Sequence, residues 1–249
     1  MIDLSRKLPI GIQTFEKLRK EGYLYVDKTA LVWQMVSTST PYFLSRPRRF
    51  GKSLLLSTFE AYFEGKKELF EGLAIEDLEK EWVTYPVLHL DLNAEKYDTP
   101  ERLNSILSNH LTQWELKYGK GVDETTLSSR FMGVIRRASE LTGRNVVVLI
   151  DEYDKPLLQA MQNEALLDEY RTTLKAFYGV LKSSDRYLRF AFLTGVTKFA
   201  QVSVFSDLNQ LQDISLWYDY ATVCGITREE LISIFHPELE VLGRANDTT

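Results

Sequence analysis

The chain has 249 residues, of which 44% are hydrophobic and 26% charged, as in ordinary globular proteins, and wholesale disorder is therefore excluded. Thirty basic and thirty-five acidic residues give a net charge of −5, which argues against a protein that coats nucleic acid or an anionic membrane. One cysteine and three scattered histidines provide neither a disulfide nor the ligand spacing of a zinc site. No apolar run reaches the roughly 18 residues of a membrane helix, and the N-terminus lacks a secretory signal, so we expect a soluble, cytoplasmic protein.

Short apolar runs alternate with longer helical patterns, and no linker or repeat interrupts them, which predicts a single domain over residues 1–249. The first predicted elements, in chain order, are a strand at 42–44, a helix from 52 to Gly65, a strand at 87–92, and helices at 103–118 and 131–141 that stop at Gly119 and Gly143. They are followed by a strand at 146–150, a helix at 167–181 and a strand at 188–193. A last helix is predicted from the Thr227/Glu230 capping box to Phe235. Beyond His236 the chain is increasingly polar, and no helical pattern is recognised there. Strands separated by helices predict an α/β fold with a mostly parallel sheet, in which ligands bind at the carboxyl ends of the strands.

The first predicted strand runs into a basic loop that ends in Gly51, Lys52 and Ser53 and is followed by a helix. This order is typical of the second half of a Walker A phosphate loop. Gly51 lets the backbone approach phosphates, Lys52 reaches their charge, and the Ser53 hydroxyl ligates magnesium. Arg46 stands where the full pattern has a glycine, and Pro47 removes one backbone donor. The tripeptide also occurs by chance and the arginines suit a solvated turn, but the position between strand and helix favours phosphate binding.

The apolar run at 146–150 ends in Asp151 and Glu152, which is a Walker B pattern. Asp151 is expected to hold magnesium through water, and Glu152 to polarise the attacking water. A buried strand also ends in acids simply where it meets solvent, but the two motifs together predict nucleotide binding. Asp154 is either a further acid that supports this pair or a turn residue.

The next strand ends in a polar segment where P-loop ATPases place a residue that contacts the γ-phosphate or the attacking water. Thr194 is the first candidate, and Thr197 or Lys198 the second. A plain turn at Gly195 is an equally good interpretation of this segment.

Over nearly its whole length the chain resembles the bacterial AAA-ATPase-like family, in which a P-loop ATPase domain usually precedes a nuclease-like domain of the PD-(D/E)xK type. The resemblance is carried by the segments LPIGIQTFEKLR, GYLYVDKTALV, YFLSRPRRFGKSLLLSTFEAYF, YPVLHLDLN, VVVLIDEYDKPLL, LRFAFLTGVTKF and VSVFSDLNQLQDIS. It implies a P-loop NTPase three-layer sandwich of the additional-strand, AAA-like type, and arginine at position 46 is usual in the family. It also implies these roles: ATP binding by Arg48, Arg49, Phe50, Gly51, Lys52 and Ser53, magnesium binding by Ser53 and Asp151, catalysis by Glu152 and Lys52, and phosphate sensing by Thr194.

Two other groups of residues have weaker signals. Related ATPases cover the adenine with residues that precede the first strand, here within 1–40, and Ile10–Gly11 and Tyr25–Asp27 are the candidates. We prefer a helix cap for Asp27, and for Tyr25 the alternative is packing beneath that helix. His89 and Asp91 share one face of a strand, but without a third ligand we favour a satisfied polar pair over a metal site.

These observations predict a protein that binds ATP and hydrolyses it with Mg²⁺ to drive a conformational change. A nucleotide-gated scaffold with little hydrolysis and a P-loop kinase are the alternatives, and Glu152 directly after Asp151 favours hydrolysis over the kinase. A homo-oligomer and an arginine finger from a neighbouring copy stay open. We further expect that residues 228–249 begin a truncated C-terminal lid, and that the chain lacks both the rest of that lid and the nuclease-like domain.

Overall fold

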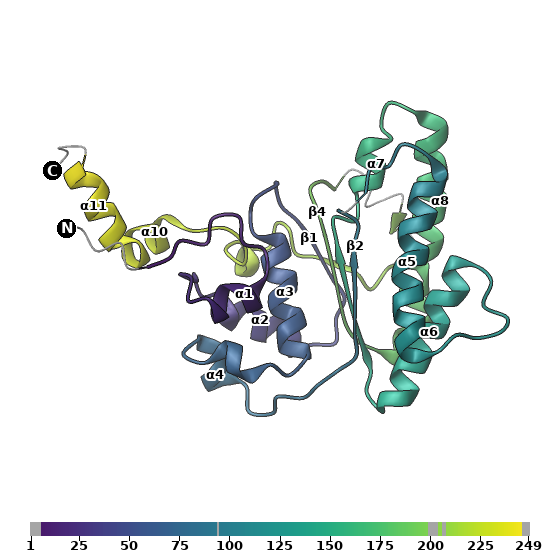
Figure 1. Ribbon diagram of the computed structural model, residues 1–249, viewed down its shortest axis with the longest axis horizontal. Helices are drawn as coiled ribbons and strands as arrows, with labels where there is room; N and C mark the ends of the chain where they lie inside the picture. Colours follow the sequence, from purple (N-terminus) through teal and green to yellow (C-terminus); the bar gives the residue numbers. More distant parts are fainter. Residues whose placement is uncertain (1–5, 94, 199–203, 206–207, 246–249) are drawn as a thin grey trace.

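The computed structural model describes residues 6–93, 95–198, 204–205 and 208–245. In this part of the chain a parallel sheet lies between two groups of helices (Figure 1). The strands are β1 (Tyr42–Ser45), β2 (Val87–Asp91), β3 (Val146–Asp151), β4 (Leu188–Gly195) and β5 (Gln212–Asp213). The α-helices are α1 (Phe15–Lys20), α2 (Thr29–Val36), α3 (Lys52–Phe63), α4 (Ala74–Leu78), α5 (Pro100–Tyr118), α6 (Leu127–Thr142), α7 (Lys155–Gln159), α8 (Glu164–Ser183), α10 (Arg228–Ile234) and α11 (His236–Ala245), and short 3₁₀ turns are η1 (Lys67–Phe70), η2 (Asp185–Tyr187) and η3 (Tyr218–Tyr220).

The strand order is β2-β3-β4-β1-β5, and each pair of neighbouring strands is parallel. This confirms the predicted α/β fold, and the insertion of β4 between β1 and β3 is consistent with a P-loop NTPase of the additional-strand type. Because the strands are parallel, their carboxyl ends meet at one edge of the sheet. Ser45 pairs with Gly195 there, and Asp91 with Asp151. The predicted phosphate loop and acidic strand end therefore share that edge.

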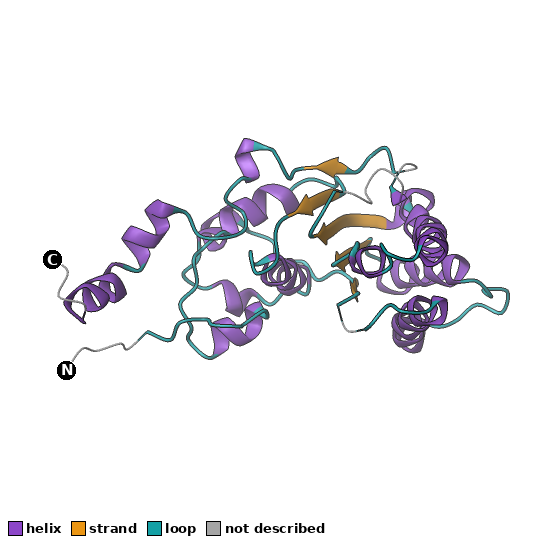
Figure 2. Ribbon diagram, turned by 90° about the horizontal axis from the view of Figure 1, so that it is seen from above, coloured by secondary structure: helices purple, strands orange, loops and turns teal. Residues whose placement is uncertain are grey.

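Strand β3 is buried along its whole length because helices cover both faces of the sheet (Figure 2). Val147 and Leu149 belong to the core formed with α1 to α4, whereas Val148 and Ile150 belong to the core formed with α5, α6 and α8. This two-sided burial explains the continuous apolar run in the sequence. It also places Asp151, two residues after Leu149, on the face that carries α3.

The C-terminal part of the fold corrects one prediction. The Thr227/Glu230 capping box is present and opens α10, as expected. The expectation that no helix follows His236 was wrong, because α11 spans His236–Ala245. Pro237 lies in the first turn of α11, where its missing N–H breaks no helical hydrogen bond, so the proline favours the helix instead of ending it. Residues 246–249, which belong to the expected lid, lie outside the described part of the chain.

Helices α10 and α11 extend away from the sheet and lie near the first described residues (Figure 1). Two ion pairs, Arg6 with Glu238 and Lys28 with Glu230, connect them to the N-terminal segment. Within the ranges that the structure describes, no helix combines the length and the apolar character needed to cross a bilayer.

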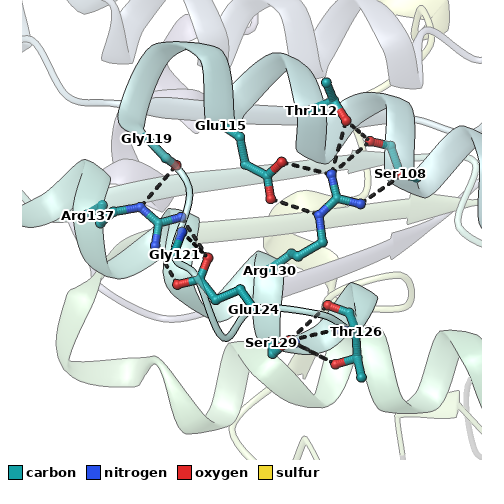
Figure 3. A network of polar contacts seen from close by, with 10 residues as sticks. All are labelled: Ser108, Thr112, Glu115, Gly119, Gly121, Glu124, Thr126, Ser129, Arg130 and Arg137. Atoms are coloured by element: carbon teal, nitrogen blue, oxygen red, sulfur yellow. Dashed lines mark hydrogen bonds and ion pairs between the residues drawn. The ribbon is translucent and has the colours of Figure 1, made fainter.

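Two arginine–glutamate pairs hold the α5–α6 hairpin on the far side of the sheet from α3 (Figure 3). The Arg130 guanidinium donates to both carboxylate oxygens of Glu115, at 2.7 and 2.8 Å, and Arg137 pairs in the same two-pronged way with Glu124. A Cβ at Gly133 would lie 1.9 Å from Glu124 Oε1. A side chain at position 133 would therefore displace the Glu124 carboxylate from this position, and the glycine leaves room for its ion pair with Arg137.

Candidate functional site

The loop between β1 and α3 has the backbone shape that the phosphate-loop motif requires. Gly51 precedes the helix with φ of 87°, in the left-handed region that favours glycine, and Arg49 also has a positive φ of 67°. Arg48, Arg49, Phe50 and Gly51 are exposed, whereas Lys52 is buried. Among the described residues, neither Arg48 nor Arg49 has a hydrogen-bond or ion-pair partner. The loop therefore presents two free guanidinium groups beside the N-terminus of a helix.

Lys52 lies beneath this loop and connects it to the end of β3. Its Nζ donates to the carbonyl oxygens of Arg46 and Pro47, at 3.2 and 3.4 Å, and forms an ion pair with Glu152 Oε1 at 3.2 Å. Burial raises the pKa of the Glu152 carboxyl, and the Lys52 ammonium limits that rise. The predicted phosphate-binding lysine and the predicted base thus form an ion pair with each other.

Asp151 joins the ends of three elements through its two carboxylate oxygens. Oδ2 accepts a hydrogen bond from Ser53 Oγ of α3 at 2.5 Å, and Oδ1 accepts one from Thr194 Oγ1 of β4 at 2.6 Å. Asp151 and Thr194 are both buried. Carboxylate and hydroxyl oxygens are the ligand types that Mg²⁺ prefers, and this ion is usually held by one or two carboxylates together with waters and substrate phosphates. The donor set therefore fits magnesium.

Glu152 has a strained backbone. Its φ is 55°, which is unusual for a residue with a side chain and costs on the order of 1–3 kcal/mol. Such a conformation persists only where neighbouring contacts hold it, and it is frequent at functional sites. The next residue supplies one of these contacts, because the Tyr153 amide donates to the carbonyl oxygen of Thr194 at 2.9 Å.

Arg46, the departure from the usual motif, has a different role from the other loop arginines. Its guanidinium donates to the carbonyl oxygens of Ser45, Ser215 and Tyr220, at 3.0, 2.6 and 3.4 Å. In addition, the Ser45 amide donates to Ser215 Oγ at 2.8 Å. Arg46 therefore fastens the start of the loop to the segment after β5. Ser215 could not be recognised from the sequence because it belongs to neither of the two nucleotide motifs. In the structure its amide also donates to Asp213 Oδ1, at 2.9 Å.

The second-choice residues after β4 contact groups outside the Asp151 cluster. Thr197 donates from its hydroxyl to Asp154 at 2.9 Å, and Lys198 forms an ion pair with Asp213 at 2.7 Å. The site around Asp151 thus contains Thr194 and neither of the two alternatives. Asp154 itself is fully buried and is the residue immediately before α7.

The N-terminal candidates are placed mainly by structural contacts. Asp27 accepts from the amide and hydroxyl of Thr29, at 2.8 and 2.6 Å, and from the Ala74 amide at 2.7 Å. It therefore bonds the first residues of α2 and α4, although the N-cap position of α2 is Lys28 and not Asp27. The Tyr25 ring packs edge-on against Phe15, with centroids 5.2 Å apart. Ile10 is exposed, and whether it or Gly11 contacts adenine stays a prediction.

The expected satisfied pair of His89 and Asp91 is not formed: His89 contacts another carboxylate, and its buried Nε2 has no hydrogen-bond partner among the described residues. Its Nδ1 lies 3.0 Å from Glu60 Oε2 of α3, while Asp91 accepts from the Asn93 amide at 2.7 Å. Burial opposes protonation of the imidazole, but nearby carboxylates, Glu60 foremost, outweigh it and raise the pKa of His89. No group of three or more His, Cys, Asp or Glu residues in the described part of the chain is arranged to hold a metal ion.

Comparisons with known proteins give the same assignment as the motifs. A family model described as "Predicted AAA-ATPase" matches residues 9–205. A protein of Azotobacter chroococcum mcd 1, named only as an uncharacterized protein in the vnfD 5' region, is 42% identical over 240 residues. The match covers 96% of this chain but 46% of that protein, so the chain spans less than half the length of its curated relative. No solved structure has a significant match.

Proposed function

The chain belongs to the AAA-ATPase-like family, and from this premise we propose that it binds ATP together with Mg²⁺ and hydrolyses it. The observation that carries the proposal is the convergence of Lys52, Ser53, Asp151, Glu152 and Thr194 at one edge of the sheet. These five side chains come from α3, from the end of β3 and from the end of β4.

Phosphate binding rests on the loop before α3. The free N–H groups at the start of α3 attract anions, and Lys52, Arg48 and Arg49 add positive charge next to them. Phe50 and Gly51 complete the loop, whose backbone amides are expected to contact the phosphates. Lys52 has to exchange its contacts with Glu152 and the loop carbonyls for the β- and γ-phosphate oxygens.

Ser53 and Asp151 would hold the magnesium ion of the nucleotide. When bound there, the ion offsets the negative charge that develops on the phosphates during transfer. Ser53 and Asp151 already contact each other, and Thr194 orients the second oxygen of the aspartate.

Hydrolysis follows once Lys52 has turned to the phosphates, because Glu152 is then a free carboxylate. Glu152 accepts a proton from a water molecule while the water oxygen bonds to the γ-phosphorus. The bond between that phosphorus and the oxygen bridging to the β-phosphate breaks, and ADP and inorganic phosphate leave. We assign to Thr194, whose hydroxyl donates to Asp151, the contact with the γ-phosphate or the attacking water.

A nucleotide-gated scaffold with slow hydrolysis is a second candidate, favoured by the ion pair that occupies both Lys52 and Glu152 in this state. Measuring release of inorganic phosphate separates it from the first: steady release indicates a hydrolase, and binding without release a scaffold. Phosphate that appears only on an added acceptor would indicate a kinase.

The assignment of the phosphate loop is tested by Lys52→Ala. Removal of a buried charged contact costs about 2–5 kcal/mol, which is a loss of roughly 30-fold to several thousandfold in affinity for ATP–Mg. Calorimetric titration measures this loss. Lys67→Ala, which removes an exposed lysine of η1, is the matched control. Equal affinities of the wild type and Lys52→Ala would refute the phosphate loop.

The wider organisation is also a proposal. It comprises a single domain over 1–249, an N-terminal segment near the adenine, a lid that begins at residue 228, assembly with further copies, and a nuclease-like domain in a longer protein. The ion pairs of Arg6 with Glu238 and of Lys28 with Glu230 support a joint movement of the N-terminal segment and this lid.

A further inference from the structure

The segment after β3 and the segment after β4 are bonded directly to each other. Both oxygens of the Asp154 carboxylate accept from the Val196 amide, at 3.2 and 3.1 Å, and Oδ2 also accepts from the Thr197 amide at 2.7 Å and the Thr197 hydroxyl at 2.9 Å. In addition, the Tyr153 phenol donates to the Thr197 carbonyl at 3.0 Å. Asp154 thus specifies the path of the chain immediately after β4.

The burial of Asp154 makes this arrangement sensitive to substitution. The side chain is fully buried, and among the described residues no lysine or arginine forms an ion pair with it. Within the described ranges, the hydrogen-bond donors to its carboxylate come from the segment after β4, and loss of such donors around a buried carboxylate is costly. A Cβ at Gly195 would lie 2.4 Å from the Tyr153 ring and 2.7 Å from Asp154 Oδ1, so the two segments approach to a distance that only glycine permits.

The residues at either end of this junction are those proposed for catalysis. Glu152, two residues before Asp154, has the strained φ of 55° that neighbouring contacts must hold. Thr194, two residues before Val196, donates to Asp151. Asp154 is not itself a base for the water, because it has no exposed surface and both of its oxygens already accept hydrogen bonds.

We propose that Asp154 is a positioning residue that fixes Glu152 and Thr194 relative to each other, so that base and phosphate sensor act on the same γ-phosphate. The proposal rests on the proposed ATPase function and adds a residue that acts without touching the nucleotide. It also explains the Asp-Glu-Tyr-Asp order, in which the fourth residue supports the second.

The test compares Asp154→Asn, Thr197→Val and Thr197→Ser in the full chain. Asparagine places an amide donor where a carboxylate oxygen accepts, valine removes only the hydroxyl bond, and serine keeps it. Since small misplacements of reacting groups cost up to about 10²-fold in rate, we expect kcat to fall roughly 10- to 100-fold in Asp154→Asn and less in Thr197→Val. Thr197→Ser should retain the wild-type rate. In all three variants, the KM for ATP should stay within about twofold of the wild-type value.

Glu115→Gln is the control, because it weakens another buried carboxylate in the α5–α6 hairpin and should lower the melting temperature without changing kcat. Unchanged kcat in a folded Asp154→Asn, or kcat and affinity that fall together with stability, would overturn the proposal. If Asp154→Asn does not fold, equal rates for Thr197→Val and Thr197→Ser would overturn it instead. A wild type that releases no phosphate would refute the proposed ATPase itself, a result distinct from an active wild type with an unaffected variant.

Discussion

Because Glu152 forms an ion pair with Lys52, we expect the substitution Glu152→Gln to slow ATP hydrolysis and at the same time to tighten ATP binding. The substitution keeps the shape of the side chain but removes the base, and general-base catalysis contributes about 10²- to 10⁴-fold, so we expect turnover to fall at least 100-fold. It also removes the charge that holds Lys52. For unit charges 3.2 Å apart, Coulomb's law with an effective dielectric constant of about 20 gives roughly 5 kcal/mol. Desolvation cancels most of this, and a net gain of about 1 kcal/mol would tighten ATP binding about fivefold.

The assay combines calorimetric binding of ATP–Mg with single-turnover hydrolysis, so that affinity and chemistry are measured separately. Glu140→Gln, an exposed glutamate of α6, is the control for the loss of one negative charge. Unchanged single-turnover hydrolysis in Glu152→Gln would show that another group activates the water. Weaker ATP binding would contradict the inference that Glu152 competes with phosphate for Lys52.

Two further predictions concern stability. Gly133→Ala should displace Glu124 from its ion pair and lower the free energy of unfolding by about 1–3 kcal/mol. Gly179→Ala in α8, where a Cβ meets no atom within 4 Å, should raise the free energy of unfolding by about 0.5–1 kcal/mol. Denaturant unfolding of both variants measures this contrast, and equal effects would disprove it. The raised pKa of His89 means that its pairing with Glu60 stabilises the fold fully below pH of about 6.5, the unfolded value, and that this contribution is lost as pH rises through the folded pKa. Melting temperatures of the wild type and His89→Gln between pH 5.5 and 8.5 should therefore converge toward alkaline pH, and a constant difference would exclude this linkage.

The strands and long helices were predictable because their signals are local. The apolar run before Asp151 is continuous since both faces of β3 are covered, and Gly119 and Gly143 end α5 and α6 as expected. Helix α11 was missed because its segment is increasingly polar and no helical pattern was recognised in it. For the candidate site, the sequence named Ser53 and Thr194, which the fold brings to Asp151.

What the sequence could not indicate are contacts between distant segments that share no motif. Arg46 and Ser215 are far apart in the chain, and only the pairing of β5 with β1 brings them together. The same holds for Asp154 and Thr197, whose contact depends on the adjacency of β3 and β4. From the sequence alone, Asp154 could be either a turn residue or an acid that supports the site. Only its contacts in the folded chain distinguish these two roles.

The arginine at position 46 has a consequence for communication through the molecule. A glycine there would leave only the bond between the Ser45 amide and Ser215 Oγ among these contacts, whereas the Arg46 side chain adds bonds to the carbonyls of Ser215 and Tyr220. If the proposed nucleotide binding shifts the loop, the shift must displace residues 215–220 or break these bonds. By thermodynamic reciprocity, any partner that binds and holds residues 215–220 alters nucleotide affinity by the same factor by which nucleotide alters the partner's affinity. Under the proposed function, the bonds of Arg46 are therefore the connection through which a movement of the phosphate loop would reach residues 215–220.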